Sequence, residues 1–261
     1  MNILDRIIAD KRKEVQLKSS LIPVSQFEKS ALFEKPCHSL AAALKYSATG
    51  IIAEYKRRSP SKQTINQNTN VGIVAKGYEK GGISGMSILT DIKYFGGSLE
   101  DLLLARASVD IPLLRKEFII DPYQILEAKA HGADAILLIA AVLTKQEIKI
   151  FSELAKSLGL DVLLEVHNQE ELEKSIMPSL DMLGVNNRDL KTFEVNLDIS
   201  KYLSAKIPDE FIKVSESGIS SVQAINELKT FGYEGFLIGE NFMRTKNPGS
   251  SAIEFIKELS L

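Results

Sequence analysis

Short runs of hydrophobic residues recur along the chain from residue 51 onward, and stretches with helical periodicity lie between them. The runs are rich in Val, Ile and Leu, which is typical of parallel strands joined by crossover helices. They predict eight strands, at residues 51–55, 85–89, 112–115, 135–140, 162–166, 182–186, 211–215 and 235–238. Their spacing of roughly 20 to 35 residues suits one strand and one helix per unit. The pattern therefore predicts an α/β fold in which eight units close a single barrel.

Residues typical of helix ends lie between these runs. Asp121, followed by a proline, predicts an N-cap and a first-turn proline, and Gly132 follows the last periodic residue of that helix. Thr144 and Glu147 have the spacing of a capping box, and Gly159 is placed to end the helix that they begin. An open, doubly wound sheet shows the same alternation of strands and helices, so the pattern alone leaves it as an alternative.

The residues before the first predicted strand do not fit the repeat. Leu4, Ile7, Ile8 and Val15 form an apolar stripe at helical spacing, and a second helical stretch follows at residues 40–44. We therefore predict one domain over residues 1–261, of which 1–48 is an N-terminal helical extension. The extension could cap the bottom or side of the barrel, or it could lie over the mouth of the active site.

Composition and charge narrow the class of protein. Hydrophobic residues make up 44% of the 261 positions and charged residues 25%, which indicates a globular domain with one large core and excludes a disordered chain. The formal net charge is only -2, with both signs interspersed, so no broad field attracts nucleic acid or an anionic membrane. A small-molecule partner is favoured over nucleic acid or membrane.

Cysteine and histidine usage excludes further classes. The single cysteine, Cys37, cannot form an internal disulfide, and His38, His131 and His167 lack metal-ligand spacing, so no metal site is predicted. The N-terminal residues mix charge with apolar positions, unlike a signal peptide, and no run approaches the roughly 20 apolar residues of a membrane span. We expect a cytoplasmic protein.

At the ends of four predicted strands, a polar side chain is followed two residues later by another polar side chain or, in one case, by an aromatic one. The pairs are Glu54 and Lys56, Lys116 and Phe118, Glu165 and His167, and Asn186 and Arg188. Residues two apart share one face of a strand, and barrel enzymes carry their catalytic groups at the carboxyl ends of strands. Any one of these charges alone could face solvent or form an ion pair. Together with Glu216 they predict a mouth of three cations and three carboxylates, which suits acid–base catalysis.

The last two predicted strands end in small residues that suit a phosphate group. Ser217 and Gly218 follow strand seven, Gly239 and Glu240 follow strand eight, and Ser59 could close the site from strand one. Phosphate is held by backbone amides at such turns, and in barrels frequently by the loops after strands seven and eight. The glycines could instead only make tight turns.

Seven segments together resemble the indole-3-glycerol phosphate synthase family of tryptophan biosynthesis. They are EYKRRSPSK, ILTDIKYFGGS, LLRKEFIIDPYQ, LLEVHN, GVNNRDL, VSESGI and FLIGENFMR, and the resemblance spans essentially the whole chain. It implies a TIM barrel with an N-terminal helical extension and no metal or organic cofactor. It also implies the reaction, which closes the indole ring of 1-(2-carboxyphenylamino)-1-deoxyribulose 5-phosphate and releases carbon dioxide and water.

The resemblance implies a role for each matching residue. Lys116 would protonate the C2 oxygen as general acid, and Glu165 would act as acid and base in the later steps. Asn186 would position Glu165 or the leaving hydroxyl. Lys56 would hold the substrate carboxylate against the ring, and Glu54 would orient Lys56.

Substrate binding is assigned by the same resemblance. Arg188 would support the mouth electrostatically, through Glu216. Phe118 and Phe95 would flank the anthranilate ring. The phosphate would be held at Ser59, Ser217, Gly218, Gly239 and Glu240, the last through its backbone amide. The expected partners are a small phosphorylated substrate and, by weak association, other enzymes of the tryptophan pathway.

Three points stay open at this stage. Gln63 and Arg58 depart from the residues common in the family, so the loop after strand one could close differently. His167 has no catalytic role by resemblance, and we expect it in the mouth or just behind it. Rival readings are a non-catalytic barrel that binds a phosphorylated metabolite and a sister barrel such as phosphoribosylanthranilate isomerase. That isomerase uses a strand-end cysteine, whereas Cys37 precedes the first strand.

Overall fold

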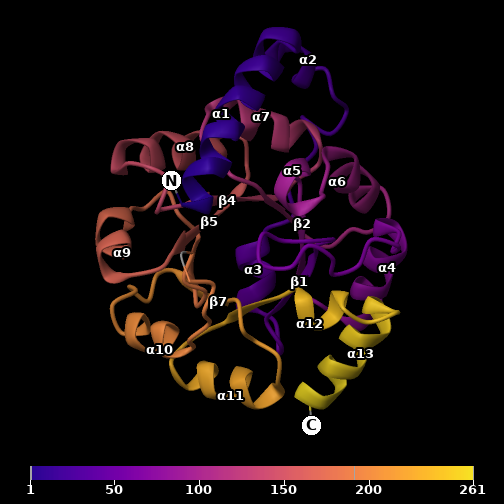
Figure 1. The fold of residues 1–261 in the computed structure, drawn as a ribbon, viewed down its shortest axis with the longest axis vertical. Helices are drawn as coiled ribbons and strands as arrows, with labels where there is room; N and C mark the ends of the chain where they lie inside the picture. The colour runs from indigo at the N-terminus through magenta and orange to yellow at the C-terminus, as the bar shows by residue number, and fades with distance from the viewer. Residues whose placement is uncertain (1, 191, 261) are drawn as a thin grey trace.

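Eight parallel strands pair in sequence order, and the last returns to the first, so the sheet is a closed barrel (Figure 1). This computed structural model describes residues 2–190 and 192–260; Met1 and Leu261, the ends of the predicted domain, lie outside that range. The strands are β1 (Ile51–Tyr55), β2 (Gly85–Leu89), β3 (Leu113–Lys116), β4 (Ala135–Ile139), β5 (Asp161–Val166), β6 (Met182–Asn186), β7 (Ile212–Glu216) and β8 (Gly235–Ile238). The closed barrel is the predicted fold, and it excludes the open doubly wound sheet.

Four predicted strands had bounds that were wrong by one residue. The predicted 112–115 and 211–215 are 113–116 and 212–216, while 135–140 ends at 139 and 162–166 begins at 161. Lys116 and Glu216 belong to the strands because they pair with Leu89 and Asn186 across the ladder. A charged residue that follows an apolar run is predicted from sequence as part of a loop, although here its backbone continues the hydrogen-bonding ladder of the sheet.

Helices follow the strands and form the outer ring in Figure 1. They are α4 (Val71–Gly81), α5 (Ile92–Phe95), α6 (Leu99–Arg106), α7 (Pro122–Ala130), α8 (Lys145–Ser157), α9 (Gln169–Ser175), α10 (Asp198–Ser204), α11 (Val222–Thr230), α12 (Glu240–Met243) and α13 (Pro248–Leu259). The predicted caps of α7 and α8 are confirmed, because Asp121 accepts from the Tyr123 amide and Thr144 forms a capping box with Glu147.

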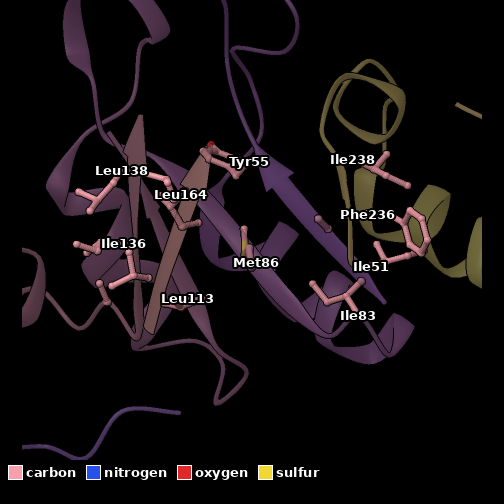
Figure 2. Packing of buried hydrophobic residues seen from close by; sticks show 14 of the residues in the cluster. Ile51, Tyr55, Ile83, Met86, Leu113, Ile136, Leu138, Leu164, Phe236 and Ile238 are labelled. Atoms are coloured by element: carbon pink, nitrogen blue, oxygen red, sulfur yellow. The ribbon is translucent and has the colours of Figure 1, made fainter. Parts of the chain in front are cut away.

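The hydrophobic core has two layers separated by the strands. The outer layer lies between strands and helices, where outward-facing side chains such as Ile51, Met86 and Leu164 pack (Figure 2). The inner layer fills the barrel with side chains such as Ile52 and Leu163. Both faces of each strand are therefore buried, as the continuous apolar runs predicted.

The N-terminal extension consists of α1 (Ile3–Leu21), α2 (Val24–Phe27) and α3 (Leu40–Lys45). Helix α3 lies in the middle of the ring in Figure 1, and its Leu40 and Leu44 side chains join the inner layer of the barrel core. Leu40 lies against Gly85, the first residue of β2, and Leu44 lies against Gly235, the first residue of β8. Helix α3 therefore closes the bottom of the barrel. Helix α1 begins at the opposite end, where Ile3 and Ile7 line a cavity. Of the two roles considered for the extension, α3 closes the bottom of the barrel and α1 lies at the mouth.

No helix among the described residues is long and apolar enough to cross a membrane.

Candidate active site

A cavity of about 340 Å³ opens at the carboxyl ends of the strands, the end at which barrel enzymes carry their active sites. Among the residues predicted from sequence, those that line the cavity are Glu54, Lys56, Ser59, Phe95, Lys116, Phe118, Glu165, Asn186, Arg188, Ser217, Gly218, Gly239 and Glu240. Glu216 is different, because its side chain is fully buried beneath this lining. It reaches the cavity through its contact with Lys116.

Two glycines make room for the carboxylates. A Cβ atom on Gly184 in β6 would lie 2.4 Å from Oε1 of Glu216, and one on Gly239 would lie 2.5 Å from Oε1 of Glu54. Both distances are too short for any real side chain to occupy. The side chains of Glu216 and Glu54 thus occupy space that these two glycines leave inside the barrel.

The Lys116 ammonium is the centre of the charge cluster. Its Nζ lies 2.5 Å from Oε2 of Glu216, 3.7 Å from Oε2 of Glu54 and 3.8 Å from Oε2 of Glu165. The Lys56 ammonium contacts the other oxygen of Glu54, with Nζ 2.5 Å from Oε1. Three carboxylates thus meet two ammonium groups, and one negative charge is left in excess.

These contacts shift the pKa values in opposite directions. Burial disfavours the charged form of Glu54, but the ammonium groups of Lys56 and Lys116 outweigh it and lower the pKa. Burial likewise disfavours a charged Lys116, yet its carboxylate neighbours raise the lysine pKa well above the ordinary value. For Glu216, burial dominates and Glu165 adds repulsion, so its pKa rises to about 7 despite Lys116. The site thus holds a charged lysine beside a carboxyl that titrates near neutral pH.

The loops after β7 and β8 form one end of the cavity. Ser217 and Gly218 both have positive φ, 66° and 79°, which is rare for serine and typical of residues held in place at functional sites. Across the mouth, the loop after β1 forms a tight turn in which Ser59 and Lys62 exchange backbone hydrogen bonds. The Lys62 Nζ then contacts Oε1 of Glu240 at 2.7 Å, which lowers the pKa of Glu240.

The opposite end of the cavity is apolar. The rings of Phe95 and Phe118 lie with centroids 5.9 Å apart at an angle of 43°. Ile3, Leu4 and Ile7 of α1 extend this wall. A flat aromatic group fits such an environment, where each ring contact contributes about 1 kcal/mol.

Asn186 and Arg188 lie at the end of β6. The side-chain oxygen of Asn186 accepts from the Arg188 amide at 3.0 Å, and Nη1 of Arg188 donates to the Phe193 carbonyl. We expected Arg188 to act through Glu216, but among the described residues no ion pair joins the two. Arg188 instead orders the loop that brings Phe193 to the cavity.

His167 lies behind Glu165 and not in the cavity lining. Its Nε2 is 3.4 Å from Oε1 of Glu165, and its Nδ1 is 3.1 Å from Oε2 of Glu171. Burial disfavours a charged imidazole, but Glu171 and Glu165 outweigh it and raise the pKa of His167. Of the two positions considered from the sequence, the one just behind the mouth is where His167 is found.

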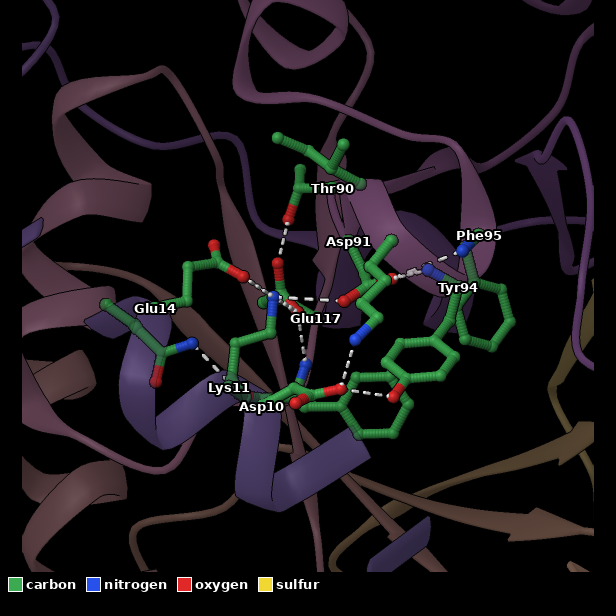
Figure 3. Close-up of polar contacts among 12 residues, drawn as sticks. Asp10, Lys11, Glu14, Thr90, Asp91, Tyr94, Phe95 and Glu117 are labelled. Carbon is green, nitrogen blue, oxygen red and sulfur yellow. Dashed lines mark hydrogen bonds and ion pairs between the residues drawn. The ribbon is translucent and has the colours of Figure 1, made fainter. Parts of the chain in front are cut away.

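Sequence reasoning missed a second charge cluster, which Figure 3 shows. The Lys11 ammonium of α1 is buried between Glu14 of its own helix and two barrel residues, Asp91 and Glu117. Glu117 directly follows Lys116 in the sequence. The only local signal was a charged residue within the apolar stripe of α1, which does not identify partners far along the chain.

The part of the chain that the structure describes contains no group of three or more His, Cys, Asp or Glu side chains arranged to hold a metal ion.

Comparison with known proteins shows what the chain is similar to. The family model described as indole-3-glycerol phosphate synthase matches residues 4–256. A relative of that name from Bacteroides thetaiotaomicron is 46% identical over 258 residues, which cover 99% of this chain and 99% of its own. Another of the same name, from Koribacter versatilis, is 42% identical over 97% of this chain and 98% of its own.

Solved structures share the fold at much lower identity. The crystal structure of KGPDC from Streptococcus mutans has a TM-score of 0.62 at 13% identity, and the match covers 82% of this chain and 98% of the other. Such a likeness shows the barrel alone. The family match, in contrast, extends through the strands, the N-terminal extension and the cavity-lining residues.

Proposed function

The chain belongs to the indole-3-glycerol phosphate synthase family, and from this membership we propose how the cavity closes the indole ring of 1-(2-carboxyphenylamino)-1-deoxyribulose 5-phosphate. The protein is a carbon–carbon carboxy-lyase of tryptophan biosynthesis. The reaction forms one carbon–carbon bond and releases carbon dioxide and water. The observation that supports our assignment is the Lys116 ammonium, held among three carboxylates inside the cavity.

Lys116 is the general acid of ring closure. The anthranilate carbon that bears the carboxylate attacks the C2 carbonyl, and negative charge develops on the carbonyl oxygen. A charged lysine next to this oxygen stabilises it and transfers a proton to it. Protonation of Glu216, whose pKa is about 7, weakens the hold on the Lys116 proton and makes the lysine a stronger acid.

The substrate lies with its ring against Phe95 and Phe118 and its phosphate at the opposite end. This orientation matches the two ends of the cavity, one apolar and one lined by small residues. Lys56, oriented by its contact with Glu54, binds the substrate carboxylate until it leaves as carbon dioxide. Positioning of this kind lowers the entropic part of the barrier.

Glu165 serves the steps after ring closure. Loss of carbon dioxide leaves a hydroxyl group at the former C2 carbonyl, and this hydroxyl departs as water while the adjacent ring carbon, the former C1 of the ribulose chain, loses a proton to form the ring double bond. Glu165 lies close to Lys116 and exchanges protons in this dehydration, with Asn186 positioning it or the leaving hydroxyl. One carboxylate can serve as acid and base in turn when its neighbours hold its charge.

The phosphate binds in the loops after β7 and β8. Ser217, Gly218 and Gly239 present backbone amides there, and Ser59 adds its hydroxyl from the loop after β1. A carboxylate next to a phosphate repels it, so the Glu240 side chain must be neutralised. Lys62 neutralises this side chain, with its Nζ 2.7 Å from Oε1 of Glu240. The backbone amide of Glu240 is then left to bind the phosphate.

We place the enzyme in the cytoplasm and expect weak association with other enzymes of the pathway. Phosphorylated metabolites carry a charge that membranes exclude, so an enzyme that uses one works in the compartment where the metabolite is made. The small phosphorylated substrate is the principal partner.

The test is a fluorescence assay for indole-ring formation from the carboxyphenylamino-ribulose phosphate. The expected result is turnover by wild type and a loss of at least about 100-fold in kcat for Lys116→Met and for Glu165→Gln. Ligand binding should persist in both variants. A well-folded wild type without turnover would exclude the synthase reaction and favour a barrel that only binds a phosphorylated metabolite.

A further inference from the structure

Lys11 carries a buried charge where α1 meets the barrel. Its side chain is 2% exposed, and its Nζ lies 2.9 Å from Oε2 of Glu14, 3.0 Å from Oδ2 of Asp91 and 3.1 Å from Oε1 of Glu117 (Figure 3). Burying an ammonium costs several kcal/mol unless partners compensate it. Burial acts to lower the pKa of Lys11, but the carboxylates outweigh it and raise the pKa, so the lysine stays charged.

The two barrel carboxylates that Lys11 contacts also hold the backbone of the aromatic wall. Oε1 of Glu117, the oxygen that Lys11 touches, accepts from the Phe118 amide at 2.8 Å. Oδ1 of Asp91 accepts from the Phe95 amide at 3.2 Å. A single ammonium thus contacts the carboxylates that hold the backbone of both rings, which pack against each other in the cavity wall.

Other contacts also hold these supports, and the Thr90 hydroxyl, next to Asp91 in the sequence, links them through Glu117. Oε2 of Glu117 accepts from the Thr90 hydroxyl at 2.9 Å, and Asp91 also accepts from the Tyr94 amide at 2.6 Å. Without the ammonium, Asp91 would lose its ion pair with Lys11 and Glu117 would keep only the longer pair with Arg115, at 3.9 Å, so the two buried carboxylates would repel. Lys116, the neighbour of Glu117, is held independently by Glu216.

We propose that Lys11 is a positioning residue that fixes how Phe95 packs against Phe118, and thereby the shape of the wall against which the aromatic ring of the substrate lies. The proposal rests on the proposed function, and it assigns to α1 a part in substrate selection. Lys11 acts through Asp91 and Glu117 and does not line the described cavity itself. Its loss loosens this wall and leaves the phosphate end unchanged.

The test compares Lys11→Met with Lys18→Met in steady-state turnover. Lys18 is a matched control because it also ties α1 to the barrel, at 3.4 Å from Glu127, without contact to the aromatic wall. For Lys11→Met we expect KM to rise about 10-fold with kcat within about threefold of wild type. Lys18→Met should leave KM within about twofold. A purely structural role would lower the active fraction, and so kcat, at unchanged KM.

Binding measurements locate the effect at the ring. The probes are the substrate reduced at its C2 carbonyl, which keeps the ring, and inorganic phosphate, which lacks it. Affinity for the first should fall about 10-fold in Lys11→Met, with affinity for phosphate unchanged. An unchanged KM, an equal rise in Lys18→Met, or an equal loss for both probes would overturn the proposal.

A second variant, Glu117→Gln, tests the proposal if Lys11→Met does not fold. Glu117→Gln breaks the link at Glu117, while Lys11 keeps Asp91 and Glu14 and so keeps α1 docked. A rise in KM supports the proposal, and an unchanged KM overturns it. Wild-type turnover is measured first, because its absence rejects the proposed function, whereas normal wild-type turnover with unaltered variants rejects only the role of Lys11.

Discussion

Two buried clusters in this protein share one plan, a lysine ammonium among three carboxylates, yet they differ in how completely their groups are paired. Around Lys11, Glu117 accepts from Thr90 and Phe118, and Asp91 caps α5. Around Lys116, Oε1 of Glu216 has no hydrogen-bond partner among the described residues. The carboxylates around Lys11 are therefore held by hydrogen-bond donors, and this cluster supports structure.

The incomplete pairing around Lys116 has a chemical consequence. A buried carboxyl oxygen without a donor favours the protonated form, and the pKa of Glu216 rises to about 7 mainly through burial. The cluster can therefore gain or lose a proton near neutral pH. The proposed catalytic cluster and the Lys11 cluster thus contain the same residue types and differ in how many hydrogen-bond donors their carboxylates meet.

Unfolding of the two lysine variants gives the largest expected difference between the clusters. Lys11→Met removes the ammonium that pairs with the buried Asp91 and Glu117 and should lower the free energy of unfolding by about 4 kcal/mol. Lys116→Met should lower it by less than about 2 kcal/mol, because the cavity admits water and Glu216 can take up a proton. Denaturant titration at one pH measures both. Equal losses in the free energy of unfolding would mean that the two clusters do not differ in how completely their charges depend on the lysine.

Local signals in the sequence predict the barrel and much of the cavity lining. Each strand–helix unit is set by residues near one another, and alternation along a strand predicts that Glu54 and Lys56 share a face. The Lys11 cluster could not be found this way, since Glu117 lies more than one hundred positions away. Nor could the depth of Glu216, which depends on the space left by Gly184 in the neighbouring strand.

The pH dependence of stability provides the next largest effect. The folded-state pKa of Glu216 is about 7, above its ordinary 4.5, so between these values the folded state binds the proton more tightly than the unfolded state. The free energy of unfolding therefore falls as pH rises through this window, by about 3 kcal/mol in total. Glu216→Gln removes this loss and should be more stable than wild type above pH 7.

Glu54→Gln is the control of opposite sign. The pKa of Glu54 is lowered by Lys56 and Lys116 against the effect of burial, so its charge stabilises the protein above the unfolded-state pKa and this stability is lost in acid. The variant should be less stable than wild type at neutral pH, with a smaller difference in acid. Unfolding curves at several pH values measure both variants. Parallel profiles for Glu216→Gln and wild type would contradict the raised pKa.

The smallest effect is expected at the ion pair of Lys62 and Glu240, whose side chains are 45% and 42% exposed. Exposed pairs contribute about 0–1 kcal/mol, so Lys62→Met should scarcely change unfolding. It frees the Glu240 carboxylate beside the proposed phosphate site, and KM should rise about threefold with kcat unchanged. The double variant Lys62→Met with Glu240→Gln removes the repelling charge and should restore KM. If KM stays raised in the double variant, Lys62 itself contacts the substrate, and the exposed pair is then part of the binding site and not a shield for it.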